Sequence, residues 1–184
     1  MRKNYEFNGA VKIVKKVSNN LISVRVDLTD KKVMVAVKKV LGCEVPKKLG
    51  INFMANGAIA WMSTDELMVS TVASSFKKIF SELTKILKPF HHLVVDISDS
   101  RTIFSVSGHS WRDLIAKGSP VNVSSEVLRV GDFRRSRLGM VAIAFWMVDE
   151  NTINIMCYRS VEEFMFDWLC NAGQINSMPE YFSV

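Results

Sequence analysis

Hydrophobic and polar positions alternate along the chain with two different periods. In residues 21–28 the side chains alternate between apolar and polar, and this period of two predicts a strand with one solvent-facing side. Short apolar runs bounded by turn residues predict further strands. These strands are expected at residues 58–62, 67–69, 93–97, 102–106, 142–146 and 153–157.

Apolar residues recur every three or four positions in other segments, which predicts amphipathic helices. The clearest case is residues 72–87, where an apolar stripe lies opposite a lysine-rich face and Pro89 ends the pattern. In the last helix the expected stripe comprises Val161, Phe164, Met165, Trp168 and Leu169. Helices are expected at residues 33–41, 72–87, 111–117 and 161–169, and loops at residues 43–56 and 119–135.

Two of these helices carry residues that can satisfy the free backbone groups at their ends. Thr29 or Asp30 precedes the first helix as a candidate cap, and Gly42 stands where that helix is expected to end. Ser160 and Glu163 match a capping box at the start of the last helix. The caps therefore agree with the boundaries that the hydrophobic periodicity predicts.

Two segments that lie 84 residues apart repeat each other. Residues 58–66 and 142–150 are identical at five of nine positions without a gap. Each copy continues into a second apolar segment and then into an amphipathic helix, and this repeated order indicates an internal duplication. The predicted fold class is therefore α+β, with two strand-helix-strand-strand-helix units and helices on one face of each sheet.

The length and the duplication together predict the domain organisation. A chain of 184 residues is long enough for one domain with a sizeable core. We expect residues 1–184 to form a single domain of two repeats, at about 20–97 and 98–174, followed by a tail at 175–184.

The composition narrows the class of protein. Apolar residues make up 48% of the chain and the mean hydropathy is +0.14, which leaves two interpretations: a large core, or apolar surface covered by a partner. The longest apolar run, residues 140–148, is much shorter than the roughly 20 residues of a membrane-spanning helix. The N-terminus lacks the apolar stretch of a signal peptide, and the three cysteines show no CxxC spacing. We therefore expect a cytoplasmic protein without a membrane partner.

Positive charge is concentrated at the N-terminal end of the chain. The net charge is +6, and residues 1–50 hold 12 Lys or Arg against 4 Asp or Glu. Such a region suits nucleic acid or an acidic protein surface. Nucleic-acid binding also requires exposed aromatic residues or a known module, and the sequence has neither, so no nucleic-acid partner is expected. An acidic protein surface and a solvated lysine face both remain open.

No group of residues in the sequence predicts catalysis. His91 and His92 are adjacent, so on a strand their side chains point to opposite faces and cannot share a metal without distortion. Residues 107–110 contain serine and histidine but lack the flanking glycine of a nucleophile elbow, and a strand-to-helix turn explains them better. The acidic pairs at 65–66 and 149–150 lie in exposed turns, which do not perturb pKa values as catalysis requires. We predict no catalytic, cofactor-binding or metal-binding residue in this chain.

Two features favour a partner interface. Arg134, Arg135 and Arg137 cluster beside an expected strand and could bind an acidic patch, with a solvated rim as the alternative. Phe166 lies off the expected apolar stripe of the last helix and needs some other burial. Either the C-terminal tail covers this ring, or the ring anchors a partner subunit. These four residues are the candidate interface positions.

A series of segments recurs in the order and spacing of a known family between about residues 57 and 172. The segments are Trp61-Met62-Ser63-Thr64-Asp65-Glu66, Val95-Asp96-Ile97-Ser98-Asp99-Ser100-Arg101, Ser107-Gly108, Lys117-Gly118, Arg137-Leu138-Gly139, Tyr158-Arg159-Ser160 and Trp168-Leu169. Together they resemble the gamma subunit of heterotetrameric sarcosine oxidase. Five positions depart from the family pattern: Ser63-Thr64 replaces Gly-Pro, Leu67 replaces Trp, and Ser119 and Asn122 replace Cys and Asp.

The resemblance implies a duplicated domain like half of the folate-binding aminomethyltransferase fold. It also implies a non-catalytic structural subunit that assembles with alpha, beta and delta subunits. That complex demethylates sarcosine oxidatively to glycine and transfers the one-carbon unit to tetrahydrofolate. The resemblance places the FAD, FMN, NAD, tetrahydrofolate and zinc in the other subunits and no cofactor in this chain.

Two alternatives remain open. One is a free-standing folate-binding protein of the aminomethyltransferase type, for which Asp96 and Asp132 are the candidates to bind the pterin edge. The other is the small subunit of a related N-methyl amino acid dehydrogenase complex. Binding of tetrahydrofolate by the pure chain would favour the first alternative.

Overall fold

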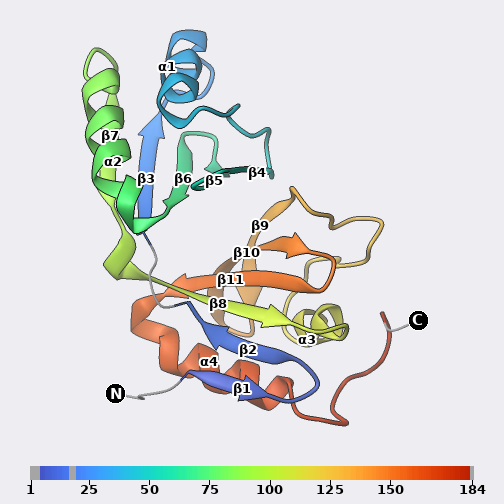
Figure 1. The fold of residues 1–184 in the computed structure, drawn as a ribbon. Helices are drawn as coiled ribbons and strands as arrows, with labels where there is room; N and C mark the ends of the chain where they lie inside the picture. The colour runs from blue at the N-terminus through green and yellow to red at the C-terminus, as the bar shows by residue number, and fades with distance from the viewer. Residues whose placement is uncertain (1–4, 17–19, 183–184) are drawn as a thin grey trace. The chain divides into compact units, whose positions relative to one another are not determined.

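The chain folds into two compact units, each with one sheet (Figure 1). The computed structural model describes residues 5–16 and 20–182. One unit comprises residues 18–99, and the other comprises residues 1–17 with 100–184. No helix in the described part of the chain is both long and apolar enough to cross a bilayer. Whether the units behave as a single domain stays a prediction.

The unit of residues 18–99 has a five-stranded antiparallel sheet in the order β4-β5-β6-β3-β7. Its strands are β3 (Asn20–Val26), β4 (Ile51–Met54), β5 (Gly57–Ser63), β6 (Glu66–Thr71) and β7 (His92–Asp96). Its helices are α1 (Lys31–Leu41) and α2 (Ala73–Leu87), which share a hydrophobic core with one face of the sheet. The helix ends follow the sequence signals: the Asp30 carboxylate accepts the backbone N–H of Lys32 at 2.7 Å, and Gly42 ends α1.

The second unit has a six-stranded antiparallel sheet in the order β1-β2-β8-β11-β10-β9. Its strands are β1 (Glu6–Asn8), β2 (Lys12–Lys15), β8 (Arg101–Ser107), β9 (Phe133–Leu138), β10 (Val141–Asp149) and β11 (Thr152–Tyr158). Its helices are α3 (Trp111–Ala116) and α4 (Glu162–Ala172), with a 3-10 turn at Arg159–Val161; another 3-10 turn, Ser98–Ser100, lies at the boundary between the units. The N-terminal strands thus join the sheet of the second repeat, which the sequence did not predict.

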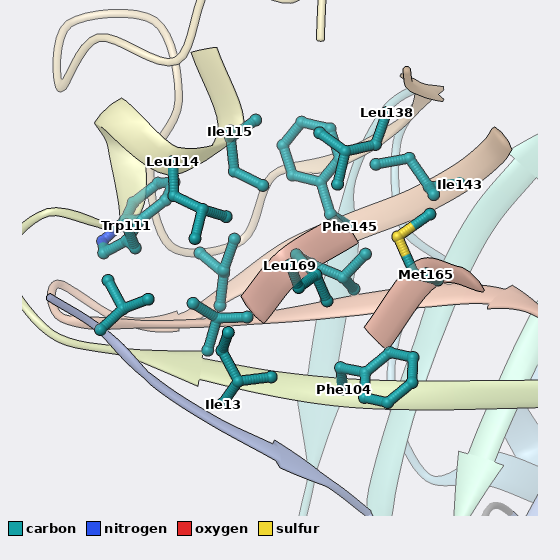
Figure 2. Packing of buried hydrophobic residues seen from close by; sticks show 14 of the residues in the cluster. Ile13, Phe104, Trp111, Leu114, Ile115, Leu138, Ile143, Phe145, Met165 and Leu169 are labelled. Atoms are coloured by element: carbon teal, nitrogen blue, oxygen red, sulfur yellow. The ribbon is translucent and has the colours of Figure 1, made fainter. Parts of the chain in front are cut away.

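The core of the second unit lies between its helices and one sheet face. Residues that alternate along β10, such as Ile143 and Phe145, lie in one cluster with Leu114 of α3 and Leu169 of α4 (Figure 2). Phe104 of β8 is also fully buried in this cluster. The α+β class is therefore confirmed, with helices covering one face of the sheet.

The predicted duplication is confirmed by the topology. The first four strands match in sheet order and in chain order, β4-β5-β6-β3 with β9-β10-β11-β8, and the fifth position is filled by β7 after α2 in one sheet and by the N-terminal β2 in the other. The repeated segments lie on the equivalent strands β5 and β10. Each hairpin has a bulge, between Trp61 and Ser63 in one and between Met147 and Asp149 in the other. Superposing the bulges pairs Trp61 with Met147, whereas the sequence match pairs Trp61 with Phe145, so the two alignments differ by two residues. An even displacement keeps every side chain on the same sheet face.

Two expected loops contain a strand each. β4 and β9 form the outer edges of their sheets within residues expected to be irregular. Edge strands pair on one side only, so they can be short and charged, and their hydrophobic pattern is weak. The predicted capping box was also wrong. Val161 is the N-cap of α4, without a side-chain cap bond, because the 3-10 turn moves the helix start past Ser160.

Candidate partner surface

The three candidate arginines lie on β9, the edge strand of the second sheet, but they do not form one cluster. Neighbouring residues on a strand point to opposite faces, so Arg134 is separated from Arg135 and Arg137. Arg134 donates to the carbonyl of Val127 at 3.4 Å and lies 3.5 Å from the Asp132 carboxylate, and it therefore holds the preceding loop.

Arg135 and Arg137 are exposed and share one face of β9. Met140, in the turn after the strand, is 89% exposed. An edge strand with two cations and an apolar side chain at its end has the composition of a protein-binding rim. Contact of these arginines with a partner stays a prediction.

Phe166 is buried within the chain, and a contact of its ring with a partner stays a prediction. The residue is 4% exposed. Its ring centroid lies 5.2 Å from that of Tyr5, in an edge-to-face arrangement, and 5.8 Å from that of Phe104. The N-terminal segment before β1 therefore supplies part of the cover.

The cause is the phase of α4. Its buried residues are Glu162, Met165, Phe166 and Leu169, whereas Phe164, which the sequence pattern placed inside, is 54% exposed. The pattern treated Glu162 as a surface residue because carboxylates are almost never buried alone. A buried glutamate turns the helix and carries Phe166 inward.

Glu162 is buried because three side chains bond its carboxylate. Thr102 donates to Oε2 at 2.5 Å, Lys15 donates at 2.9 Å, and the Tyr5 hydroxyl donates to Oε1 at 3.1 Å. Burial raises the pKa of Glu162, but the hydrogen bonds from Thr102, Lys15 and Tyr5 outweigh it and the pKa is lowered. This charge cluster links the N-terminal strand β2 to β8 and α4. No sequence signal identified it, because its members come from distant segments.

Two segments cover α3 in the same unit. The buried guanidinium of Arg112 donates to the carbonyls of Val123 and Leu128, and so holds the loop between α3 and β9. The buried carboxylate of Asp113 accepts the backbone N–H groups of Tyr181 and Phe182 at 2.9 and 3.3 Å. As a result, five of the six residues of α3 are buried.

The candidate catalytic and metal-binding residues of the sequence make local structural contacts. Nδ1 of His92 lies 2.9 Å from the carbonyl oxygen of Phe90. Gly108 has φ of +129°, as expected for a strand-to-helix turn. The Ser63 hydroxyl holds the pKa of Asp65 below its ordinary value, and Arg25 pairs with this carboxylate at 3.2 Å. Within residues 5–16 and 20–182, no group of three or more His, Cys, Asp or Glu is placed to hold a metal ion.

The comparisons with known proteins identify the family. The model of the sarcosine oxidase, gamma subunit family matches residues 25–174. The chain belongs to the sarcosine oxidase gamma subunit family. The resemblance found in the sequence is thereby confirmed. Among curated proteins, none matches the chain in sequence.

Two solved structures show the same fold. A chain of the heterotetrameric sarcosine oxidase from Corynebacterium sp. U-96, in complex with pyrrole 2-carboxylate, superposes with a TM-score of 0.81 at 18% identity, covering 91% of this chain and 87% of that one. Glycine cleavage system aminomethyltransferase T from Bartonella henselae superposes with a TM-score of 0.69 at 12% identity. This second match covers 92% of this chain but 48% of the transferase, as expected for a domain that resembles part of that enzyme.

Several gamma-subunit motif residues meet inside the second unit. The backbone N–H of Gly139 donates to the carbonyl of Gly118 at 2.9 Å. A Cβ atom at Gly118 would lie 2.5 Å from Cζ2 of Trp168, so only glycine allows this close approach. The Lys117 ammonium donates to the carbonyl of Ala172 at 2.6 Å, at the end of α4. These motif residues therefore join α3, β9 and α4 and serve the architecture of the unit.

Proposed function

We propose that this chain is the non-catalytic gamma subunit of a heterotetrameric sarcosine oxidase, in which it stabilises the assembly. The observation that carries this proposal is the family match across residues 25–174. The fold shared with a chain of the Corynebacterium heterotetramer supports it. The complex would demethylate sarcosine oxidatively to glycine in the cytoplasm and pass the one-carbon unit to tetrahydrofolate.

In this proposal the FAD, FMN, NAD, tetrahydrofolate and zinc belong to the alpha, beta and delta subunits. The buried ionisable groups of this chain support such a division. The Glu162 carboxylate is engaged by three donors. Burial raises the pKa of Cys157 to about 12, so this thiol stays protonated and is unsuited to nucleophilic attack.

The edge of β9 is one surface through which the chain could meet another subunit. Arg135 and Arg137 offer charge to an acidic patch, and the backbone of an edge strand can pair with an extended segment. Phe166 is a poor anchor in comparison, because its ring is already buried within the chain.

Co-expression with the alpha, beta and delta subunits of the same organism tests the proposal. A tag on this chain should recover all four subunits in equal amounts, with flavin absorbance and sarcosine-dependent oxygen consumption in the recovered complex. The isolated chain should be colourless and inactive with sarcosine. Recovery of the chain alone, or stoichiometric flavin in the isolated chain, would overturn the proposal.

Folate binding by the free chain is a second candidate, favoured by the fold shared with aminomethyltransferase T. Its two carboxylates are occupied locally. Asp96 accepts the backbone N–H of Ser98 at 2.9 Å, and Asp132 accepts that of Arg129 at 2.8 Å. Calorimetric titration of the isolated chain with tetrahydrofolate separates the two candidate functions. Saturable 1:1 binding would favour a folate-binding protein.

A further inference from the structure

The helices of residues 18–99 carry a basic surface with a recessed apolar floor. Together with the adjoining Lys88, α1 and α2 hold eight lysines and a single acidic residue, Glu82. All eight lysines are exposed. Of these eight, only Lys38 forms an ion pair with another described residue, Glu44. The lysines are Lys31, Lys32, Lys38, Lys39, Lys77, Lys78, Lys85 and Lys88. We call this set the lysine surface.

Two hollows flank α2 within the lysine surface, and Lys85 lines both. The hollow on the α1 side is lined by the aliphatic residues Val40 and Ile86, by Lys39 and Lys85, and by one acidic residue, Glu82. The hollow on the β7 side includes Phe80, whose ring stacks on Phe76 at 6.0 Å. All four of these apolar side chains are half-buried. A ligand that combines apolar groups with negative charge would therefore match the apolar residues and the excess of lysines that line the hollows.

The duplication provides an internal comparison. α3 follows strand β8 as α1 follows β3, and α4 follows the hairpin of β10 and β11 as α2 follows that of β5 and β6. In the second unit the loop held by Arg112 and the segment held by Asp113 cover α3, and five of its six residues are buried. In the first unit only three residues of α1 and two of α2 are buried. The helix that follows the first strand is thus covered in the second repeat as α3, whereas its equivalent α1 has only three of eleven residues buried.

We propose that the lysine surface binds an acidic amphipathic segment of another subunit of the complex, an inference that rests on the proposed function. A helix with apolar residues at i, i+3, i+4 and i+7 fits a groove with an apolar floor, and flanking carboxylates would meet the lysines at the rim. Nucleic acid fits less well, because its bases need exposed aromatic faces and Phe76 and Phe80 stack on each other. A membrane fits less well, because the apolar side chains that line the hollows, Val40, Ile86 and Phe80, are half-buried.

The test uses the full chain in the co-expressed complex. The variant Lys39→Glu/Lys85→Glu reverses two charges that line one hollow. Its matched control, Lys47→Glu/Lys48→Glu, makes the same change in net charge at two exposed positions of the same unit outside the helices. Unfolding temperatures of all three proteins, measured first, show that both variants keep the fold, as expected for exposed lysines.

The Lys39/Lys85 variant should weaken assembly at least about tenfold, and the control should change it less than about twofold. Added salt should weaken the binding of the wild-type chain to the other subunits more steeply than that of the Lys39/Lys85 variant, because the variant has fewer ion pairs for salt to screen. Equal affinity of wild type and both variants overturns this inference alone. Failure of the wild type to assemble overturns the proposed function as well. Binding of DNA or anionic vesicles that is lost in the Lys39/Lys85 variant, with assembly unchanged, assigns the surface to those ligands and also overturns the inference.

Discussion

Replacement of Phe166 by alanine should destabilise the isolated chain strongly. Burial of a phenylalanine side chain contributes about 1.5–3 kcal/mol, and Phe166 is 4% exposed. Each aromatic pair contributes about 0.5–1.5 kcal/mol beyond its area, and the variant loses the contacts with Tyr5 and Phe104. The expected loss is therefore about 3–5 kcal/mol, in the range of Phe→Ala changes in protein cores.

Phe164 provides the matched control on the same helix. Its side chain is 54% exposed, so Phe164→Ala should change the free energy of unfolding by about 0.5 kcal/mol or less. Urea unfolding of the wild type and both variants measures the difference directly, from the midpoint and slope of each transition.

The two variants also decide between the core and interface roles of Phe166. A loss of stability below about 1 kcal/mol for Phe166→Ala, or one equal to that of Phe164→Ala, would refute the argument from burial. If that small loss came with weakened assembly of the four-subunit complex, the ring would be an interface anchor after all. A large loss of stability accounts for any assembly defect without a direct contact.

Three further predictions follow from the second unit. Because the pKa of Glu162 is lowered by folding, its carboxylate stabilises the fold at pH values above the ordinary pKa of 4.5, and this contribution is lost as the pH falls through the pKa of the folded state. Glu162→Gln should lower the free energy of unfolding by about 2–4 kcal/mol at pH 7, because the part-buried Lys15 loses its counter-charge. In urea unfolding, the difference in stability between wild type and variant should narrow below pH 4.5, and a difference that does not change with pH would contradict this role. Gly118→Ala should cost about 1–3 kcal/mol in thermal unfolding, because its Cβ would meet the Trp168 ring, and an unchanged unfolding temperature would show that the ring moves aside freely. Cys157 should resist alkylation at pH 8 in the folded chain and react after unfolding, as mass spectrometry can measure, because burial raises its pKa to about 12; rapid modification of the folded chain would contradict its burial.

The sequence predicted the elements whose hydrophobic period is regular. α1, with its Asp30 cap, and α2 lie within a few residues of their expected positions, and the repeated hairpins occupy equivalent strands. The edge strands β4 and β9 were missed because an edge needs little apolar pattern: β9 has three arginines in six residues. The pairing of β2 with β8 joins residues about 90 positions apart, which no local period can indicate.

The partner positions were harder to predict, because an apolar side chain on a helix has the same pattern whether it faces a core or another protein. Phe166 was expected at an interface and is buried, since three donors allow Glu162 to turn the helix inward. α2 shows the opposite case: its stripe is the most regular in the sequence, yet only Leu83 and Leu87 are fully buried and the remaining members stay half-buried or exposed beside lysines. A duplicated fold separates these cases, because it presents the same helix layer twice. In the second copy a loop and the C-terminal segment are bonded to α3, whereas in the first copy most of the apolar stripe of α2 stays half-buried, and this difference points to the surface that another subunit would cover.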